Sequence, residues 1–330
     1  MGKFFSFRYA LLLGILLFSI GSYELVMKHS SHADTINSEY DKLYDAVDSV
    51  KDSSLIKSPS VIHNDKTLNV LGTYIALGES ADSILDKLGS PSRIAKTEMN
   101  FDYYVYSNNY SKLLFVAISD KKVVGYYTDS IDFDYLEITS GSSLDKVNSS
   151  LNTNFAMDYI LTHITENYRL HIFMDKIGTG MVTGMSLLST DVKENGYTID
   201  IMRDIELLVY DLTNSIRKRN GIPILSWSST AAKAAAKHSM DMAENLYFGH
   251  YNLYNKNPGD RLKEEGIYYQ SIGENIIAGY ENAIISSHAW FNSPEHRSNM
   301  LNKSYTSLGV GFTYLEKSIY KTYITQVFYR

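Results

Sequence analysis

The segment Trp290-Phe-Asn-Ser-Pro-Glu-His-Arg297 contains the start of a helix in the C-terminal third of the chain. Ser293 is a preferred N-cap residue, Pro294 suits the first helical position, and the carboxylate of Glu295 in the first turn is stabilised by the helix dipole. We therefore interpret Glu295 as part of a helix start in preference to a metal ligand. His296 follows within the same turn.

The sequence around this segment predicts long helices before it and strands after it. Apolar residues three or four positions apart indicate a helix over 201–216 and a second helix after the cap cluster 228–230. His238 lies on the apolar face of the second helix and is predicted to be a hydrogen-bonded core residue. His288 is predicted to lie at the surface or the edge of the core. The runs 307–314 and 320–329 predict two strands.

Five short motifs in this part of the chain follow the order found in a known family. They are Asn214-Ser-Ile-Arg217, Ala-Lys-His238-Ser239 with Met242-Ala243, Phe-Gly-His250, Gly-Glu274-Asn, and Ser-Pro-Glu-His296-Arg. From about Glu206 to Arg330 the chain resembles the CAP superfamily, the cysteine-rich secretory, antigen 5 and pathogenesis-related-1 proteins, in its bacterial cysteine-free branch. The resemblance implies an α-β-α sandwich with a central antiparallel sheet.

The resemblance also implies a ligand cleft lined by two histidines and two glutamates. Three of these positions fall on His250, Glu274 and His296, whereas the fourth, which is a Glu in eukaryotic members, is Ser293 here. Two imidazoles and one carboxylate can hold Zn²⁺ with an open position, so His250, His296 and Glu274 are candidate ligands of a divalent metal such as zinc. Glu274 can equally be a structural carboxylate that accepts backbone N–H bonds.

A repeated pattern organises the middle of the chain. Ile75-x-x-Gly78-x-Ser80 recurs as Ile138-x-x-Gly141-x-Ser143, and each copy is followed by two apolar residues four positions apart. Ser80 and Ser143 are candidate N-caps, and strand-like runs joined by turns at 119–122 and 175–178 follow the two copies. We predict a duplicated helix-plus-hairpin α+β domain over 67–200, ahead of the CAP domain over 201–330. It resembles the CAP-associated N-terminal domain of Gram-positive bacteria.

The N-terminus predicts contact with a membrane. Lys3 and Arg8 precede an uncharged apolar run over 9–23, which is typical of a signal peptide or a signal anchor within 1–27. We favour the anchor, followed by a polar stalk over 28–66. The positive residues before the run place the rest of the chain outside the cytoplasm.

Composition narrows the range of functions. The absence of cysteine excludes disulfides and thiolate zinc sites, and a net charge of −6 argues against nucleic acid as a partner. Two functions stay open. The first is a non-enzymatic module, secreted or anchored at the cell surface, that binds a lipid, peptide, cell-wall or divalent-ion ligand. The second is a hydrolase of cell-surface substrates that uses a metal-bound water, or a serine such as Ser239 acting with a histidine and a carboxylate. We favour binding, and catalytic residues stay unassigned.

Overall fold

The computed structural model describes residues 65–280 and 282–330, all within one compact unit that spans His63–Arg330. The predicted signal segment over 1–27 and almost all of the predicted stalk over 28–66 lie outside the described residues. In the described ranges, no helix has the length and apolar character needed to cross a bilayer.

The N-terminal part of the described chain is mostly β-structure with two short helices. Its elements are β1 (Thr67–Val70), β2 (Thr73–Ala76), α4 (Ala81–Leu88), β3 (Arg93–Lys96), β4 (Asp102–Tyr106), the 3₁₀ turn η1 (Tyr110–Lys112), β5 (Leu114–Ser119), β6 (Lys122–Thr128), β7 (Phe133–Tyr135), β8 (Ile138–Thr139), α5 (Leu144–Leu151), β9 (Ile160–Ile164), β10 (Tyr168–Met174) and β11 (Val182–Ser189).

The C-terminal part has five helices and four strands. Its elements are α6 (Ile199–Arg219), β12 (Ser226–Trp227), α7 (Ser229–Glu244), α8 (Pro258–Glu264), β13 (Ile272–Ala278), α9 (Ala283–Phe291), α10 (Pro294–Met300), β14 (Ser307–Tyr314) and β15 (Thr322–Tyr329). The mixture of helices and sheets confirms the predicted α+β class.

An antiparallel seven-stranded sheet, in the order β3-β4-β5-β6-β11-β10-β9, dominates the N-terminal part. A smaller sheet in the order β2-β1-β7-β8 accompanies it. Ser80 and Ser143 cap α4 and α5 by accepting from the amides of Ser83 and Lys146, as predicted. The two predicted hairpin turns join β5 to β6 and β10 to β11. The duplication itself stays a prediction.

The C-terminal part is the predicted α-β-α sandwich. Its sheet, in the order β12-β14-β15-β13, is antiparallel except for the short β12–β14 pair. Because side chains alternate along a strand, Leu308, Val310 and Phe312 of β14 join the core with α6 and α9 on one face. Gly309 and Gly311 alternate with them and lie against α7 on the other face.

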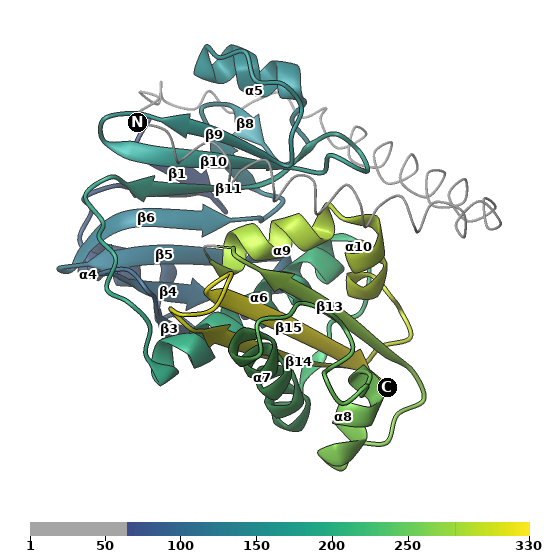
Figure 1. Cartoon of the computed structure of the whole chain (residues 1–330). Helices are drawn as coiled ribbons and strands as arrows, with labels where there is room; N and C mark the ends of the chain where they lie inside the picture. The colour runs from purple at the N-terminus through teal and green to yellow at the C-terminus, as the bar shows by residue number, and fades with distance from the viewer. Residues whose placement is uncertain (1–64, 281) are drawn as a thin grey trace, which may run out of the picture. The chain divides into compact units, whose positions relative to one another are not determined.

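Helices α6 and α9 lie between two sheets (Figure 1). One continuous core joins their apolar residues to the four-stranded sheet on one side and to residues of the seven-stranded sheet such as Phe115, Tyr127 and Phe173 on the other. The opposite face of the seven-stranded sheet packs on the smaller sheet, α4 and α5 in a second core. The two parts of the chain therefore share a hydrophobic layer.

Candidate functional site

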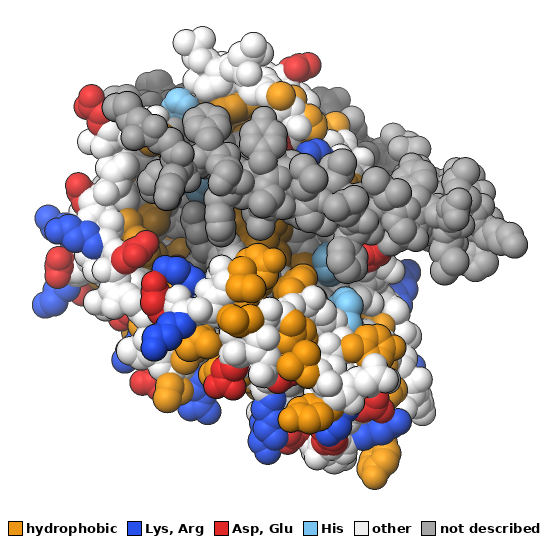
Figure 2. Space-filling view, in the orientation of Figure 1, with side chains coloured by type: hydrophobic (Ala, Val, Ile, Leu, Met, Phe, Trp, Pro, Cys, Tyr) orange, Lys and Arg blue, Asp and Glu red, His pale blue; other side chains and the backbone are white. Residues whose placement is uncertain are grey.

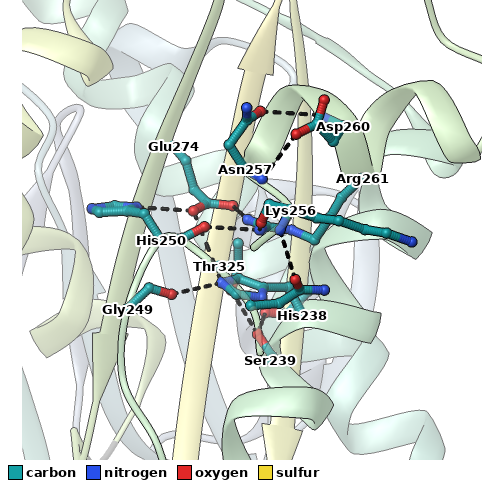
Figure 3. A network of polar contacts seen from close by, with 12 residues as sticks. His238, Ser239, Gly249, His250, Lys256, Asn257, Asp260, Arg261, Glu274 and Thr325 are labelled. Atoms are coloured by element: carbon teal, nitrogen blue, oxygen red, sulfur yellow. Dashed lines mark hydrogen bonds and ion pairs between the residues drawn. The ribbon is translucent and has the colours of Figure 1, made fainter. Parts of the chain in front are cut away.

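Glu274 is the centre of the polar site on the outer face of the sandwich. It lies on β13 opposite Val327 of β15, and Val327 packs on α7 and Leu262 of α8. Strand alternation thus points Glu274 towards α7 and α8, where His238 and Arg261 lie (Figure 3). Its side chain is only 1% exposed, so its charge needs partners.

Both carboxylate oxygens of Glu274 have side-chain partners. Nδ1 of His250 lies 2.9 Å from Oε1, and the Arg261 guanidinium donates to Oε2. Nε2 of His238 is 4.0 Å from Oε1. The partners of Glu274 are therefore side chains and not the backbone N–H groups that a structural role was predicted to involve.

Arg261 also fixes the loop that carries His250. Its NH1 donates to the carbonyl oxygens of His250 and Lys256 at 2.8 and 2.9 Å. Helix α8, which carries Arg261, begins with a capping box between Asn257 and Asp260. Arg261 could not be identified from the sequence, because a cation in a short helix has the pattern of a surface residue. The one signal that points to Arg261 is that a buried carboxylate such as that of Glu274 requires a cation as its partner.

His250 presents the accessible edge of the site. Its side chain is 49% exposed, and the ring lies on one side of Glu274 (Figure 3). Since Nδ1 faces Glu274, Nε2 is the ring nitrogen directed outward. A ligand can reach this nitrogen without displacing Glu274 or Arg261.

His296 lies on α10 and forms a pair with Ser293. Its Nδ1 is 2.8 Å from the Ser293 hydroxyl oxygen. Ser293 occupies the N-cap position of α10 as predicted, but its side chain caps no backbone amide and bonds His296 instead. Burial, and next the charge of His250, lower the pKa of His296 to about 4, so the ring is neutral at pH 7.

A buried amide network ties the two halves of the site together. Asn275, the neighbour of Glu274 on β13, donates to the carbonyl oxygen of His296 at 3.1 Å. Asn299 of α10 donates to the carbonyl oxygen of Glu274 at 3.1 Å and to the side chain of Asn275 at 2.9 Å. The fold thus brings the pair His250–Glu274 and the pair Ser293–His296 to adjacent positions.

The groups that donate to Glu274 determine whether its carboxylate oxygens are free to bind a metal ion. A Zn²⁺ ligand needs a free carboxylate oxygen, whereas one oxygen of Glu274 holds a guanidinium and the other holds an imidazole. Within 65–280 and 282–330 no group of three or more His, Cys, Asp or Glu side chains is arranged to hold a metal ion. The residues present do not fit a resident zinc ion that uses Glu274.

Ser239 and His238 are buried in the sandwich beneath the site. The Ser239 hydroxyl donates to the carbonyl oxygen of Gly311 at 3.0 Å and lies 2.9 Å from Thr325 Oγ1. Nε2 of His238 bonds the Gly249 carbonyl oxygen at 2.9 Å, and burial lowers the pKa of His238. His238 is the predicted core imidazole.

The prediction for His288 is wrong. Its side chain is fully buried between the two parts of the chain, where Nε2 lies 3.0 Å from the hydroxyl of Tyr127 on β6. The sequence places His288 on an apolar helix next to Trp290, but nothing in it reveals that a second sheet covers that helix.

Two family models match the chain. Residues 210–328 match the cysteine-rich secretory protein family, CAP, and residues 77–196 match the CAP-associated N-terminal family. The uncharacterized membrane protein YlbC of Bacillus subtilis (strain 168) is 28% identical over 278 residues, which are 73% of this chain and 80% of that protein. The uncharacterized protein YkwD of the same organism is 38% identical over 107 residues, 32% of this chain and 42% of that protein.

Two solved structures share the fold. An extracellular protein containing an SCP domain from Bacillus anthracis (strain Ames) has a TM-score of 0.67 at 23% identity and covers 84% of this chain and 100% of its own. A cysteine-rich secretory protein from Staphylococcus aureus Mu50 has a TM-score of 0.59 at 15% identity, over 81% of this chain and 95% of its own. Residues 210–328 therefore form a domain of the cysteine-rich secretory protein (CAP) family, and residues 77–196 ahead of it form a domain of the CAP-associated N-terminal family.

Proposed function

We propose that this chain is an extracytoplasmic protein whose CAP domain binds a ligand at His250, Glu274, His296 and Ser293 without transforming it. One observation carries the proposal. Both oxygens of Glu274 are bonded to Arg261 and His250, so the only carboxylate of this site is neither a free general base nor a free metal ligand. A structural carboxylate that orients His250 suits recognition of a ligand.

The arrangement of Ser239 argues against a serine hydrolase. A nucleophilic hydroxyl must reach the substrate and must have a base within hydrogen-bond distance. The hydroxyl of Ser239 is fully buried and is bonded to Gly311 and Thr325, neither of which is a base. Ser239 therefore has a role in joining α7 to the sheet.

Exposed apolar side chains flank His250 in the sequence and support a ligand with an apolar portion. The loop that carries His250 exposes Leu246, Phe248, Tyr251, Leu253 and Tyr254. Hydrophobic side chains gather on the face of Figure 2, and histidine side chains reach the surface beside the position of α10. A lipid or a peptide, with apolar groups for this loop and polar groups for His250 and His296, fits these side chains better than a bare ion.

The proposed location follows from the N-terminus and from a relative. The apolar run over 9–23 with Lys3 and Arg8 before it supports export, with the segment 1–27 as anchor. The name of the Bacillus subtilis relative YlbC describes a membrane protein. For the domain limits we propose 67–200 and 201–330, and the matches to the two family models fall inside these ranges.

A binding panel with matched histidine variants tests the proposal. The purified full chain is titrated with phosphatidylglycerol vesicles, soluble peptidoglycan fragments, a library of short peptides and Zn²⁺, and the same samples are assayed for ester, peptide and peptidoglycan hydrolysis. The matched control for His250→Ala is His163→Ala, because His163 lies on the edge strand β9 of the other domain.

We expect one lipid or peptide probe to bind the wild type and the His163→Ala variant, and its affinity to fall at least tenfold in His250→Ala. We expect no turnover of any substrate. Turnover that disappears in His250→Ala and persists in His163→Ala would overturn the proposal in favour of a hydrolase. Binding that is equal in all three proteins would place the ligand elsewhere.

A further inference from the structure

The turn between β10 and β11 of the N-terminal domain holds the junction between α9 and α10 of the CAP domain. Asn292, at the end of α9, donates from Nδ2 to the carbonyl oxygen of Met174 at 3.0 Å and accepts from the amide of Lys176 at 2.8 Å. Arg297 of α10 forms an ion pair with both oxygens of Asp175, the longer contact being 3.2 Å. Residues 174–176 of the N-terminal domain are thus bonded to Asn292 and Arg297 of the CAP domain.

Contacts within its own turn hold Asp175 in place in addition to the bonds with Arg297. The side chain is almost fully buried, and Oδ2 accepts from the amide of Thr179 at 3.0 Å. A Cβ atom at Gly178 would lie 2.4 Å from a carboxylate oxygen of Asp175, so the turn closes tightly around this group. Burial opposes ionisation, but the hydrogen bonds from Arg297 and Thr179 outweigh it and hold the pKa of Asp175 below its usual value. The N-terminal domain therefore presents a fixed negative charge.

The guanidinium of Arg297 has a second fixed neighbour. It lies 4.0 Å from the centre of the Phe291 ring, which stacks under it from the end of α9. The ion pair with Asp175 and the contact with Phe291 together define the angle between α9 and α10.

Ser293 and His296, the two site residues at the start of α10, lie between Asn292 and Arg297 in the chain. Ser293 follows Asn292, and His296 precedes Arg297, so the backbone that carries the Ser293–His296 pair is held at both ends by residues 174–176. On its other side the same backbone is held by Asn275, which donates to the His296 carbonyl oxygen. Without the N-terminal contacts, only the CAP domain's own bonds would orient His296.

We propose that the β10–β11 turn of the N-terminal domain positions His296, so that the ligand site of the CAP domain is completed by another domain. Asp175, Asn292 and Arg297 are positioning residues, and none of them contacts the ligand. The effect on binding rests on the proposed function, whereas the effect on His296 itself does not.

The experiment compares two interdomain ion pairs in the full chain. Asp175→Asn keeps the size of the side chain and its acceptor for Thr179 but removes the charge, and Arg297→Lys keeps a cation but loses the paired geometry. The matched control is Arg93→Gln, which breaks the 2.6 Å pair with Asp211 between β3 and α6. This pair joins the same two domains at the edge of the seven-stranded sheet opposite to β9.

The readout is the ¹H–¹³C NMR cross-peak of the His296 ring at a fixed pH of 7.5, assigned with a His296→Gln variant, next to the melting temperature. We expect Asp175→Asn to shift or split the His296 cross-peak, and Arg297→Lys to produce a smaller shift in the same direction. Arg93→Gln lowers the melting temperature but leaves the cross-peak in place. A His296 cross-peak that is unchanged in folded Asp175→Asn and Arg297→Lys overturns the proposal, as does an equal shift in Arg93→Gln.

The ligand probes separate this proposal from the proposed function. For whichever probe binds the wild type, we expect its affinity to fall at least threefold in Asp175→Asn and to stay unchanged in Arg93→Gln. A His296 cross-peak that moves while no probe binds supports positioning and removes the binding function. If a probe binds but the His296 cross-peak does not move in the variants, the positioning of His296 by the β10–β11 turn is contradicted and the binding function is supported.

Discussion

His288 of the CAP domain stacks on Phe173 of the N-terminal domain, with ring centroids 3.9 Å apart and planes 9° from parallel. The imidazole is fully buried, and its Nε2 lies 3.0 Å from the hydroxyl of Tyr127. Burial, and next the positive charge of Arg219, lower the pKa of His288 well below its ordinary value. A neutral imidazole is therefore part of the core that the two domains share.

Acid should weaken this interface. In the unfolded chain His288 takes up a proton below about pH 6.5, whereas in the folded chain it does not, so the free energy of unfolding falls as the pH drops below that value. His288→Phe keeps an aromatic ring but cannot be protonated. We expect the wild type to lose about 1–2 kcal/mol more than this variant between pH 7 and pH 5. Urea denaturation at both pH values measures the difference, and parallel pH curves would contradict it.

Arg261 should contribute more to the free energy of unfolding than a surface cation does. Arg261→Met leaves Glu274 buried without its ion-pair partner, which costs about 3–5 kcal/mol. Adding Glu274→Gln removes the buried charge, so the double variant should be more stable than Arg261→Met alone. Chemical denaturation of the single variants and the double variant tests this. Additive losses would mean that the two side chains do not interact.

Gly311 should tolerate no side chain. A Cβ atom at this position would lie 1.9 Å from the backbone nitrogen of Ala236 in α7, so the helix must move away from β14. We expect Gly311→Ala to cost about 3 kcal/mol or more, because overpacking displaces a whole helix. Gly249→Ala is the matched control, since the nearest atom to its Cβ would be 3.9 Å away. Equal thermal stability of the two variants would refute the close approach of α7 to the sheet.

Glu206 should make the protein less stable as the pH rises. Burial raises the pKa of this α6 carboxyl to about 7, while a hydrogen bond from the Phe312 amide at 3.0 Å opposes the shift. The folded state therefore binds a proton more tightly than the unfolded state between pH 4.5 and 7, and stability falls across that range.

Glu206→Gln keeps an oxygen for Phe312 and removes the charge. We expect it to be about 1–3 kcal/mol more stable than the wild type at pH 8, with the gap narrowing towards pH 5. Denaturation curves at the two pH values measure the gap. A variant that is less stable than the wild type by the same margin at both pH values would contradict the assignment.

The long elements could be predicted from the sequence because each carries its own periodic pattern. The stripe from Ile201 to Ile216 becomes α6, the run after Ser228 becomes α7, and the apolar runs after each Gly-x-Ser become β5, β6, β10 and β11. Helices α6 and α7 bury apolar residues at helical spacing, whereas β5, β6, β10 and β11 are mostly apolar runs buried on both faces of their sheet, so the pattern of each element reveals it.

Strands β1 and β7 and the pairing of the smaller sheet could not be predicted, whereas β2 and β8 end just ahead of Gly78 and Gly141, where the sequence predicts strand ends. Strands β1 and β7 have four and three residues, too few for alternation to be visible, and their pairing joins Asn69 to Asp134, 65 positions later in the chain. Their pairing is set by the second core and not by local sequence.

The sequence predicts which residues belong to the candidate site, but it does not predict which of them contact one another. His250, Glu274, His296 and Ser293 were identified through family motifs. The ion pairs Arg261–Glu274 and Asp175–Arg297 join side chains from separate segments, 13 and 122 positions apart in the chain. The bond between Ser293 and His296 is local, but it replaces the backbone cap that is expected of Ser293. No spacing rule connects residues 122 positions apart.

The place of β15 in the sheet has a consequence for the order of assembly. This strand lies between β14 and β13, although both precede it in the chain. In the sheet β13 and β14 share no edge, so the two strands are joined only through residues 322–329, which come last in the chain. The strands of the seven-stranded sheet are all in place by residue 189. The strands of the N-terminal sheet are therefore all present in the chain before the CAP sheet has its central strand.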